Sequence, residues 1–246
     1  MPDPALFEIP YDPDWGYERT FFLDTEHRYT KMHRLLREAV GDLSGTRVLD
    51  LGCCRGLLLE RFRRYEGVEL AGLEIDPEEA RQAEQRGLRP VRHHINRFEG
   101  DRMVARLPFA DASADVVLAG EILEHVVDTE GFLREIGRVL AAGGAVSLST
   151  PNILWWKHRL SLLAGRYPDA LEYRLRYGDD FGHVRLFGPG ELRGLLEEVG
   201  FRDVRIVGKR LGPTASLTGP GARLLDRAAD RLPGLSDNLI AVALRA

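Results

Sequence analysis

Short apolar runs alternate with longer amphipathic runs along most of the chain. The apolar runs are rich in valine, leucine and alanine, and they cover residues 46–51, 68–75, 114–119 and 144–149. Glycine, proline or acidic residues bound each of them, which is typical of buried parallel strands. The runs between them have helical patterns and cover residues 57–65, 77–87 and 129–141. This alternation predicts β-α-β units and therefore an α/β fold with a doubly wound sheet.

The C-terminal part of the chain does not continue the strand–helix alternation. Residues 189–199 predict a helix that ends at Gly200. Residues 201–209 and 238–245 predict two strands without a long crossover pattern between them, so we expect this pair to be antiparallel. The segment between the two strands contains one short amphipathic helix, at residues 222–232.

A chain of 246 residues fits one large α/β domain with a modest addition. We assign residues 41–246 to this domain and residues 1–40 to an N-terminal segment that leads into a helix, a candidate lid. Residues 151–188 hold a predicted helix and a loop that is too long to be a mere connection, and such loops are usually functional when ordered. Residues 210–236 are an insertion between the last two strands.

Composition and charge narrow the functional classes. Apolar residues make up 44% of the chain and charged residues 29%, as in ordinary soluble globular proteins. A net charge of -4 argues against a broad nucleic-acid footprint, so nucleic acid is not an expected partner. No apolar run approaches the roughly 18 residues of a membrane span, and the start of the chain matches neither a signal peptide nor a transit peptide. The adjacent Cys53 and Cys54 form no disulfide framework, so we expect a cytoplasmic protein.

Candidate chemistry begins at the turn after the first predicted strand. Residues 50–56, DLGCCRG, lead into a helix, and their glycines allow the backbone to approach a ligand closely. Glu74 ends the second strand, where a carboxylate can accept hydrogen bonds from ribose hydroxyls. Asp50 would repel the pyrophosphate of a dinucleotide, but it suits a ligand that carries an ammonium and a sulfonium. The turn therefore favours S-adenosylmethionine over NAD.

Several stretches carry a resemblance to class I S-adenosylmethionine-dependent methyltransferases. The family's first motif is similar to VLDLGCCRGLLL, its second to LAGLEIDPEEARQA, and its following stretch to LPFADASADVVLAGEILEHVVDTEGFLREIGRVLAAGGAVSLSTPN. The match covers residues 46–152, and residues 182–201 resemble the late helix and sixth strand of the same family. The resemblance implies a Rossmann-like seven-stranded sheet that is mostly parallel, with an antiparallel last strand and a helical N-terminal lid.

The same resemblance implies which residues hold the cofactor. It assigns the ribose hydroxyls to Glu74, the adenine face to Ile75, and the cofactor loop to Asp50, Gly52, Cys54 and Gly56. Cys54 stands where the family has a second glycine, and its β-carbon costs about 1 kcal/mol if the backbone needs glycine-like angles. The family often places an adenine-contacting acid four residues before its LPF triplet. That position is Met103 here, so Asp101, two residues earlier, is the candidate.

Glu121, Glu124 and His125 follow the fourth strand and form the second candidate cluster. Spacings of three and four predict one helical face for all three, with Cβ atoms about 5–6 Å apart. These donors suit Mg²⁺ or Mn²⁺, with His183 as a fourth ligand. The run is similar to the metal-binding run of quinone-biosynthesis O-methyltransferases and of small-RNA 3′-end methyltransferases. In the alternative without a metal, His125 acts as a base or hydrogen-bonds the acceptor.

Taken together, these features predict an S-adenosylmethionine-dependent methyltransferase that acts on a small-molecule acceptor. The expected reaction is O-methylation of a hydroxyl, with His125 and Glu121 as catalytic residues. Two alternatives stay open. An NAD(P)-dependent reductase would share the glycine loop and Glu74, but it leaves Asp50 unexplained. A non-catalytic protein of the same fold, which binds the cofactor or a partner, is kept open by Cys54.

Overall fold

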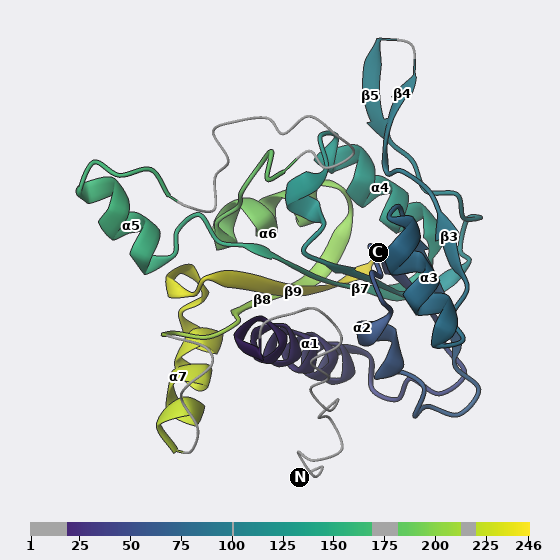
Figure 1. The fold of residues 1–246 in the computed structure, drawn as a ribbon, viewed down its shortest axis with the longest axis horizontal. Helices are drawn as coiled ribbons and strands as arrows, with labels where there is room; N and C mark the ends of the chain where they lie inside the picture. Colours follow the sequence, from purple (N-terminus) through teal and green to yellow (C-terminus); the bar gives the residue numbers. More distant parts are fainter. Residues whose placement is uncertain (1–18, 100, 169–181, 213–219) are drawn as a thin grey trace.

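A seven-stranded sheet forms the centre of the computed structural model, which describes residues 19–99, 101–168, 182–212 and 220–246 (Figure 1). In spatial order the strands are β3 (Pro90–Arg92), β2 (Glu69–Glu74), β1 (Arg47–Leu51), β6 (Ala114–Gly120), β7 (Leu140–Pro151), β9 (Asn238–Arg245) and β8 (Phe201–Gly208). The first five pair in parallel, and β9 runs antiparallel to both β7 and β8. The predicted doubly wound sheet with an antiparallel last strand is confirmed.

Helices cover both faces of this sheet (Figure 1). One face packs against α1 (Arg19–Val40), α2 (Leu57–Glu60) and α3 (Pro77–Gln85), and the other packs against α4 (Thr129–Val139) and α6 (Pro189–Glu198). The period of two in a strand explains how one sheet serves two cores. In β9, Leu239 and Ala241 enter the core under α4 and α6, whereas Ile240 and Val242 enter the core under α1.

Three local elements depart from the pattern expected from the sequence. The helix expected at 57–65 is α-helical only over α2 and continues as turns. The short edge strand β3 was not predicted, because three residues that start with a proline give no periodicity. A two-stranded hairpin, β4 (Asn96–Glu99) and β5 (Arg102–Ala105), was also not predicted, and Figure 1 shows that it projects from the body of the molecule.

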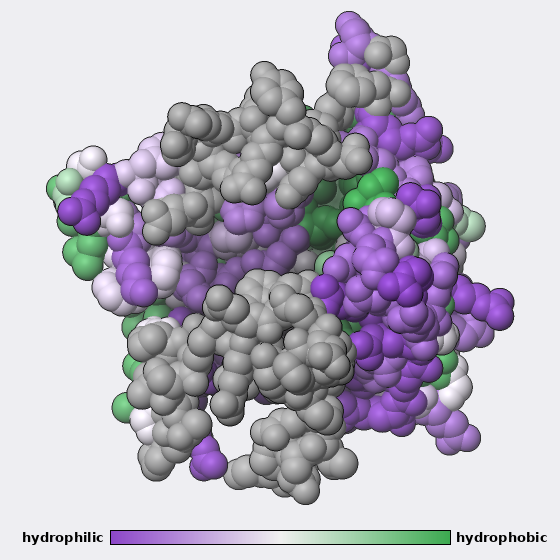
Figure 2. All heavy atoms as spheres, in the orientation of Figure 1, coloured by the Kyte–Doolittle hydropathy of each residue, from purple (hydrophilic) through white to green (hydrophobic). Residues whose placement is uncertain are grey.

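The three predicted additions to the domain are described only in part. In the N-terminal segment α1 begins at Arg19, and residues 1–18 lie outside the described residues. Residues 151–188 contain α5 (Trp156–Leu163), with 169–181 outside the described part. The insertion contains α7 (Pro220–Arg231), with 213–219 outside it. Figure 2 shows hydrophobic side chains at the end occupied by α5, where Leu160, Leu162 and Leu163 are exposed.

Within the described residues, no helix combines the length and apolar character required to cross a membrane.

Candidate functional site

A cavity of about 530 Å³ opens at the carboxyl ends of β1, β2 and β6. The strand order of the sheet reverses between β1 and β6, and ligands of doubly wound proteins bind at such a point. The wall contains the turn after β1, the end of β2, the segment after β3, the segment after β6 and one face of α1. Most of the residues singled out by the sequence therefore meet around one space.

The turn after β1 is built from left-handed backbone positions. Gly52, Cys54 and Gly56 have φ angles of +72°, +45° and +81°. A Cβ at Gly52 would lie 2.7 Å from Cδ1 of Ile122, and one at Gly56 would collide with Leu88. Gly52 and Cys54 line the cavity, whereas Gly56 caps α2 behind it. Cys54 thus occupies a conformation that favours glycine, the residue that the family resemblance places at this position.

Glu74 ties this turn to the end of β2. Its carboxylate is 6% exposed and accepts backbone N–H groups from Cys54, Ile75 and Asp76, each at 2.8 Å. Three donors leave room for a further hydrogen bond on a carboxylate, which can accept about four. Glu74 and the half-exposed Ile75 both line the cavity, beside the turn.

Asp50 lies beneath the turn rather than in the wall of the cavity. It is 2% exposed and is not among the lining residues. Burial, and then the neighbouring Glu74 carboxylate, raise the pKa of Asp50 well above its usual value, while the charge of Arg28 acts in the opposite direction. A positively charged ligand nearby would favour the ionised form of Asp50.

The expected adenine contact of Asp101 requires a correction. Asp101 lies in the exposed turn between β4 and β5 and does not line the cavity, because the hairpin carries the chain away from the sheet. The wall at this place is formed instead by the segment after β3, which includes His93, His94 and Asn96. Asn96 donates to the carbonyl of His125 at 2.8 Å and so joins this segment to the one after β6.

Glu121 does not share a helical face with Glu124 and His125. The segment after β6 forms a short 3₁₀ turn at Leu123–His125, and Glu121 precedes it with φ +56°. The Glu121 carboxylate accepts hydrogen bonds from Ser149 Oγ and Asn238 Nδ2, each at 2.8 Å, and it forms an ion pair with Arg28 Nη1 at 3.1 Å. The prediction of one face fails because the chain turns sharply before the helical turn begins.

Glu124, His125 and His183 come together in the cavity. One candidate ligand atom from each residue lies within 4.8 Å of the others, and the two imidazole rings are 5.0 Å apart. Glu124 is fully buried; Thr150 donates to its Oε2 at 3.0 Å, and its Oε1 has no hydrogen-bond partner among the described residues. Burial, and then the nearby Glu121, raise the pKa of Glu124 well above its usual value. Of the four expected metal ligands, three therefore lie together, whereas Glu121 forms an ion pair with Arg28 instead.

A family model described as a methyltransferase domain matches residues 25–206 of the chain. The chain belongs to the class I S-adenosylmethionine-dependent methyltransferases. This membership sets aside the NAD(P)-dependent reductase, because the cofactor of the family is S-adenosylmethionine.

The relatives of this methyltransferase are distant in sequence. It is 29% identical over 193 residues to a protein of Mycobacterium tuberculosis classed as an S-adenosylmethionine-dependent methyltransferase, covering 78% of this chain and 62% of that one. It is 28% identical over 209 residues to a ubiquinone biosynthesis O-methyltransferase of Erwinia tasmaniensis, covering 77% and 78%. A solved methyltransferase structure from Thermotoga maritima shares the fold, with a TM-score of 0.62 at 17% identity over 95% of this chain and 96% of that one. The chain thus spans less than two thirds of the mycobacterial relative.

The sequence analysis missed part of this methyltransferase's cavity wall. Thr25, Arg28 and Tyr29 of α1 line it, and their spacing of three and four places them on one helical face. The spacing is visible in the sequence, but nothing in it shows which face of α1 turns toward the glycine turn. His93 and His94 enter the wall because β3, too short to be predicted, ends beside β2.

Proposed function

We propose that the chain transfers a methyl group from S-adenosylmethionine to a hydroxyl of a small-molecule acceptor. The observation that carries this proposal is the joining, in one cavity, of the glycine turn with Glu74 and of the Glu124–His125–His183 group. The first set suits the nucleoside of the cofactor, and the second suits an acceptor that must lose a proton. The O-methyltransferases among the relatives support a hydroxyl acceptor.

The wall fits S-adenosylmethionine in both shape and charge. Gly52 presents bare backbone to the cavity, which allows a ligand to approach closely, and the apolar Ile75 offers a surface for a purine. Glu74 would hold the ribose hydroxyls. Arg28 has an Nε with no hydrogen-bond partner among the described residues, and a guanidinium there would hold the carboxylate of the methionine part. Asp50 would favour the ammonium from beneath the turn.

The chain's own residues would then orient and deprotonate the acceptor. S-adenosylmethionine supplies a methyl group that is already activated on a sulfonium, so much of the acceleration comes from holding the hydroxyl in line with it. Nδ1 of His125 lies 2.8 Å from the carbonyl oxygen of Gly182. Since a carbonyl only accepts, Nδ1 carries the hydrogen and the lone pair is on Nε2. We assign the general base to that nitrogen.

A specific observation favours a divalent cation as the alternative to a His125 base, because the Nε2 lone pair of His125 would then bind the cation. Glu124, His125 and His183 offer three ligand atoms within 4.8 Å, and the buried Oε1 of Glu124 accepts no hydrogen bond from the described residues. One carboxylate and two imidazoles suit Mn²⁺ or Zn²⁺ better than Mg²⁺, which prefers oxygen ligands. A cation held there would bind vicinal hydroxyls and lower the pKa of one of them.

The proposal is tested by binding first and by methyl transfer second. Calorimetry with S-adenosylhomocysteine should show saturable binding, and labelled S-adenosylmethionine should label hydroxylated acceptors such as catechols. His125→Ala should retain cofactor binding and lose transfer. If the chain binds the cofactor but transfers no label to hydroxylated acceptors, the proposed O-methylation is wrong and the result favours the non-catalytic alternative.

The cation is tested separately, by titrating metal-free protein with Mn²⁺ in a calorimeter. Glu124→Gln should abolish the binding heat, and Glu130→Gln, which removes an exposed carboxylate of α4, should leave it unchanged. Methyl transfer that survives exhaustive EDTA treatment would contradict the cation and leave His125 as the sole base.

A further inference from the structure

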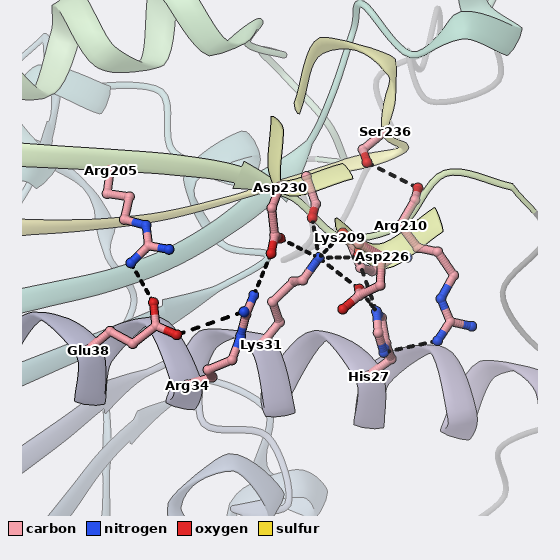
Figure 3. Close-up of polar contacts among 11 residues, drawn as sticks. His27, Lys31, Arg34, Glu38, Arg205, Lys209, Arg210, Asp226, Asp230 and Ser236 are labelled. Atoms are coloured by element: carbon pink, nitrogen blue, oxygen red, sulfur yellow. Dashed lines mark hydrogen bonds and ion pairs between the residues drawn. The ribbon is translucent and has the colours of Figure 1, made fainter. Parts of the chain in front are cut away.

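A buried lysine lies on α1 outside the wall of the cavity. The Lys31 side chain is 2% exposed, and its ammonium lies 2.8 Å from a carboxylate oxygen of Asp226 and 2.8 Å from one of Asp230, both on α7. The same ammonium donates to the carbonyl of Gly208 at 2.8 Å and to that of Lys209 at 2.9 Å, at the end of β8. Lys31 therefore joins α1 to α7 and to the sheet (Figure 3).

A second buried lysine holds the beginning of α1. Lys209 is also 2% exposed, and its ammonium lies 2.6 Å from Asp24 Oδ2 and 2.8 Å from Asp237 Oδ2. One turn along α1, Nε2 of His27 lies 3.1 Å from Asp226 and 3.0 Å from the carbonyl oxygen of Lys209. We call Asp24, His27, Lys31, Lys209, Asp226 and Asp230 the α1 anchor cluster.

The two halves of α1 are held in different ways. In the C-terminal half, Met32, Leu35 and Leu36 are fully buried in the hydrophobic core. In the N-terminal half, residues 24–30 are only partly buried, and ion pairs hold the side chains of Asp24, His27 and Arg28. Loss of an ion pair should therefore loosen the N-terminal half while the apolar half stays in place.

The N-terminal half is also the part that reaches the cavity. Thr25, Arg28 and Tyr29 line it, on the helical face next to the one that carries Asp24 and His27. A helical turn moves as a unit, so the anchor cluster on one face fixes the side chains on the other. The anchor cluster would in this way keep Arg28 in place for its ion pair with Glu121, in which the N–O distance is 3.1 Å.

We propose that Lys209 and its partner Asp24 are positioning residues for the cofactor: they anchor the first turns of α1 so that Arg28 and Tyr29 stay in the cavity wall. This inference rests on the proposed binding of S-adenosylmethionine. The α1 anchor cluster would make that binding depend on contacts outside the cavity, on α7 and the end of β8.

Asp24→Asn is the sharpest test, because it removes one charge while Lys209 keeps Asp237 and no buried cation is left alone. A partly exposed ion pair contributes up to about 1 kcal/mol. The population of molecules in which the first turns of α1 are detached should therefore increase, and affinity for S-adenosylhomocysteine should fall up to about five-fold. Amide hydrogen exchange at residues 24–30 should become faster, with residues 32–36 unchanged. Glu38→Gln removes exposed ion pairs with Arg205 and Arg34 in the other half of α1. Arg34 keeps its pair with Asp230, so this variant should change neither quantity.

The outcomes separate this inference from the proposed function. If the unmodified protein fails to bind S-adenosylhomocysteine, the proposed cofactor binding is wrong, and the exchange data still report whether the anchor exists. If it binds and Asp24→Asn binds equally well, the positioning role is wrong, whether or not exchange becomes faster. Faster exchange over all of α1, with a lower melting temperature and unchanged affinity, would reduce Lys209 and Asp24 to a purely structural role.

Discussion

Glu74 holds the backbone of two segments, and the ribose contact proposed above would be a second role; substitutions can separate the two. One carboxylate oxygen accepts the N–H of Cys54 in the turn after β1, and the other accepts those of Ile75 and Asp76 after β2. Glu74→Ala removes all three acceptors. Glu74→Gln keeps an oxygen for Ile75 and Asp76 but turns an amide group toward the Cys54 N–H, where two donors would face each other.

The expected magnitudes follow from these contacts. Hydrogen bonds to a charged group contribute about 1.5–3 kcal/mol each, and water can reach only the cavity side of this group after truncation. We expect Glu74→Ala to lower the free energy of unfolding by about 2–4 kcal/mol and Glu74→Gln by about 1–2 kcal/mol. Loss of the charged acceptor for the ribose should weaken S-adenosylhomocysteine binding by about one to two orders of magnitude in both variants.

Urea unfolding and calorimetry measure the two effects independently. Glu79→Gln is the matched control, because Glu79 is a nearby carboxylate that pairs with Arg55. It should leave cofactor affinity within about two-fold, as expected for a group without a ligand contact. A Glu74→Ala protein as stable as the unmodified one would refute the backbone role, and unchanged affinity would refute the ribose contact.

Three further outcomes are expected from the same region. Cys54→Gly should raise the free energy of unfolding by up to about 1 kcal/mol by relieving the left-handed backbone, with cofactor affinity equal or tighter; a large loss in calorimetry would show that the thiol takes part in binding. Gly56→Ala should cost more than Gly143→Ala in urea unfolding, because both positions have positive φ but only the first meets Leu88; equal losses would mean that Leu88 adjusts freely. Because the folded-state pKa of Glu124 is raised, stability should fall as pH rises from about 4.5 toward that pKa, and Glu124→Gln should remove the fall; a parallel pH profile in the variant would contradict this.

Local periodicity predicted six of the seven strands of the sheet and its main helices. The strands expected at 46–51 and 114–119 match β1 and β6 within one residue at either end. The tail was equally predictable, and β9 does run antiparallel to its neighbours. These elements bury apolar side chains at regular intervals, so their pattern reflects their environment directly.

The misses have different physical causes. β3 and the described side chains of the β4–β5 hairpin are mostly exposed or only partly buried, so these strands leave no apolar pattern, and Asp101 was misplaced as a result. The Glu121 geometry failed because residue spacing assumes a regular helix, whereas the backbone there is left-handed. The contribution of Arg28 depends on how α1 packs on the sheet, and a single sequence does not contain that information.

The left-handed positions show how the carboxylates around the cavity divide their roles. Four non-glycine residues in the described part of the chain have positive φ, and two of them, Cys54 and Glu121, line the cavity. A carboxylate fixes each of these two positions. Glu74 accepts a hydrogen bond from the Cys54 N–H. Glu121 is fixed through its own carboxylate, which contacts Ser149, Asn238 and Arg28. Such strained positions persist only when their surroundings fix them.

Two of the cavity's carboxylates, Glu74 and Glu121, therefore help to shape its backbone, and Glu121 also pairs with Arg28 of α1. Glu124 differs from both, because one of its buried oxygens accepts no hydrogen bond from the described residues. A buried acceptor without a donor is costly unless a proton, a cation or a substrate hydroxyl satisfies it. The chemistry of the acceptor site should consequently depend on Glu124 and its two histidine neighbours, with Glu121 holding the wall against which they act.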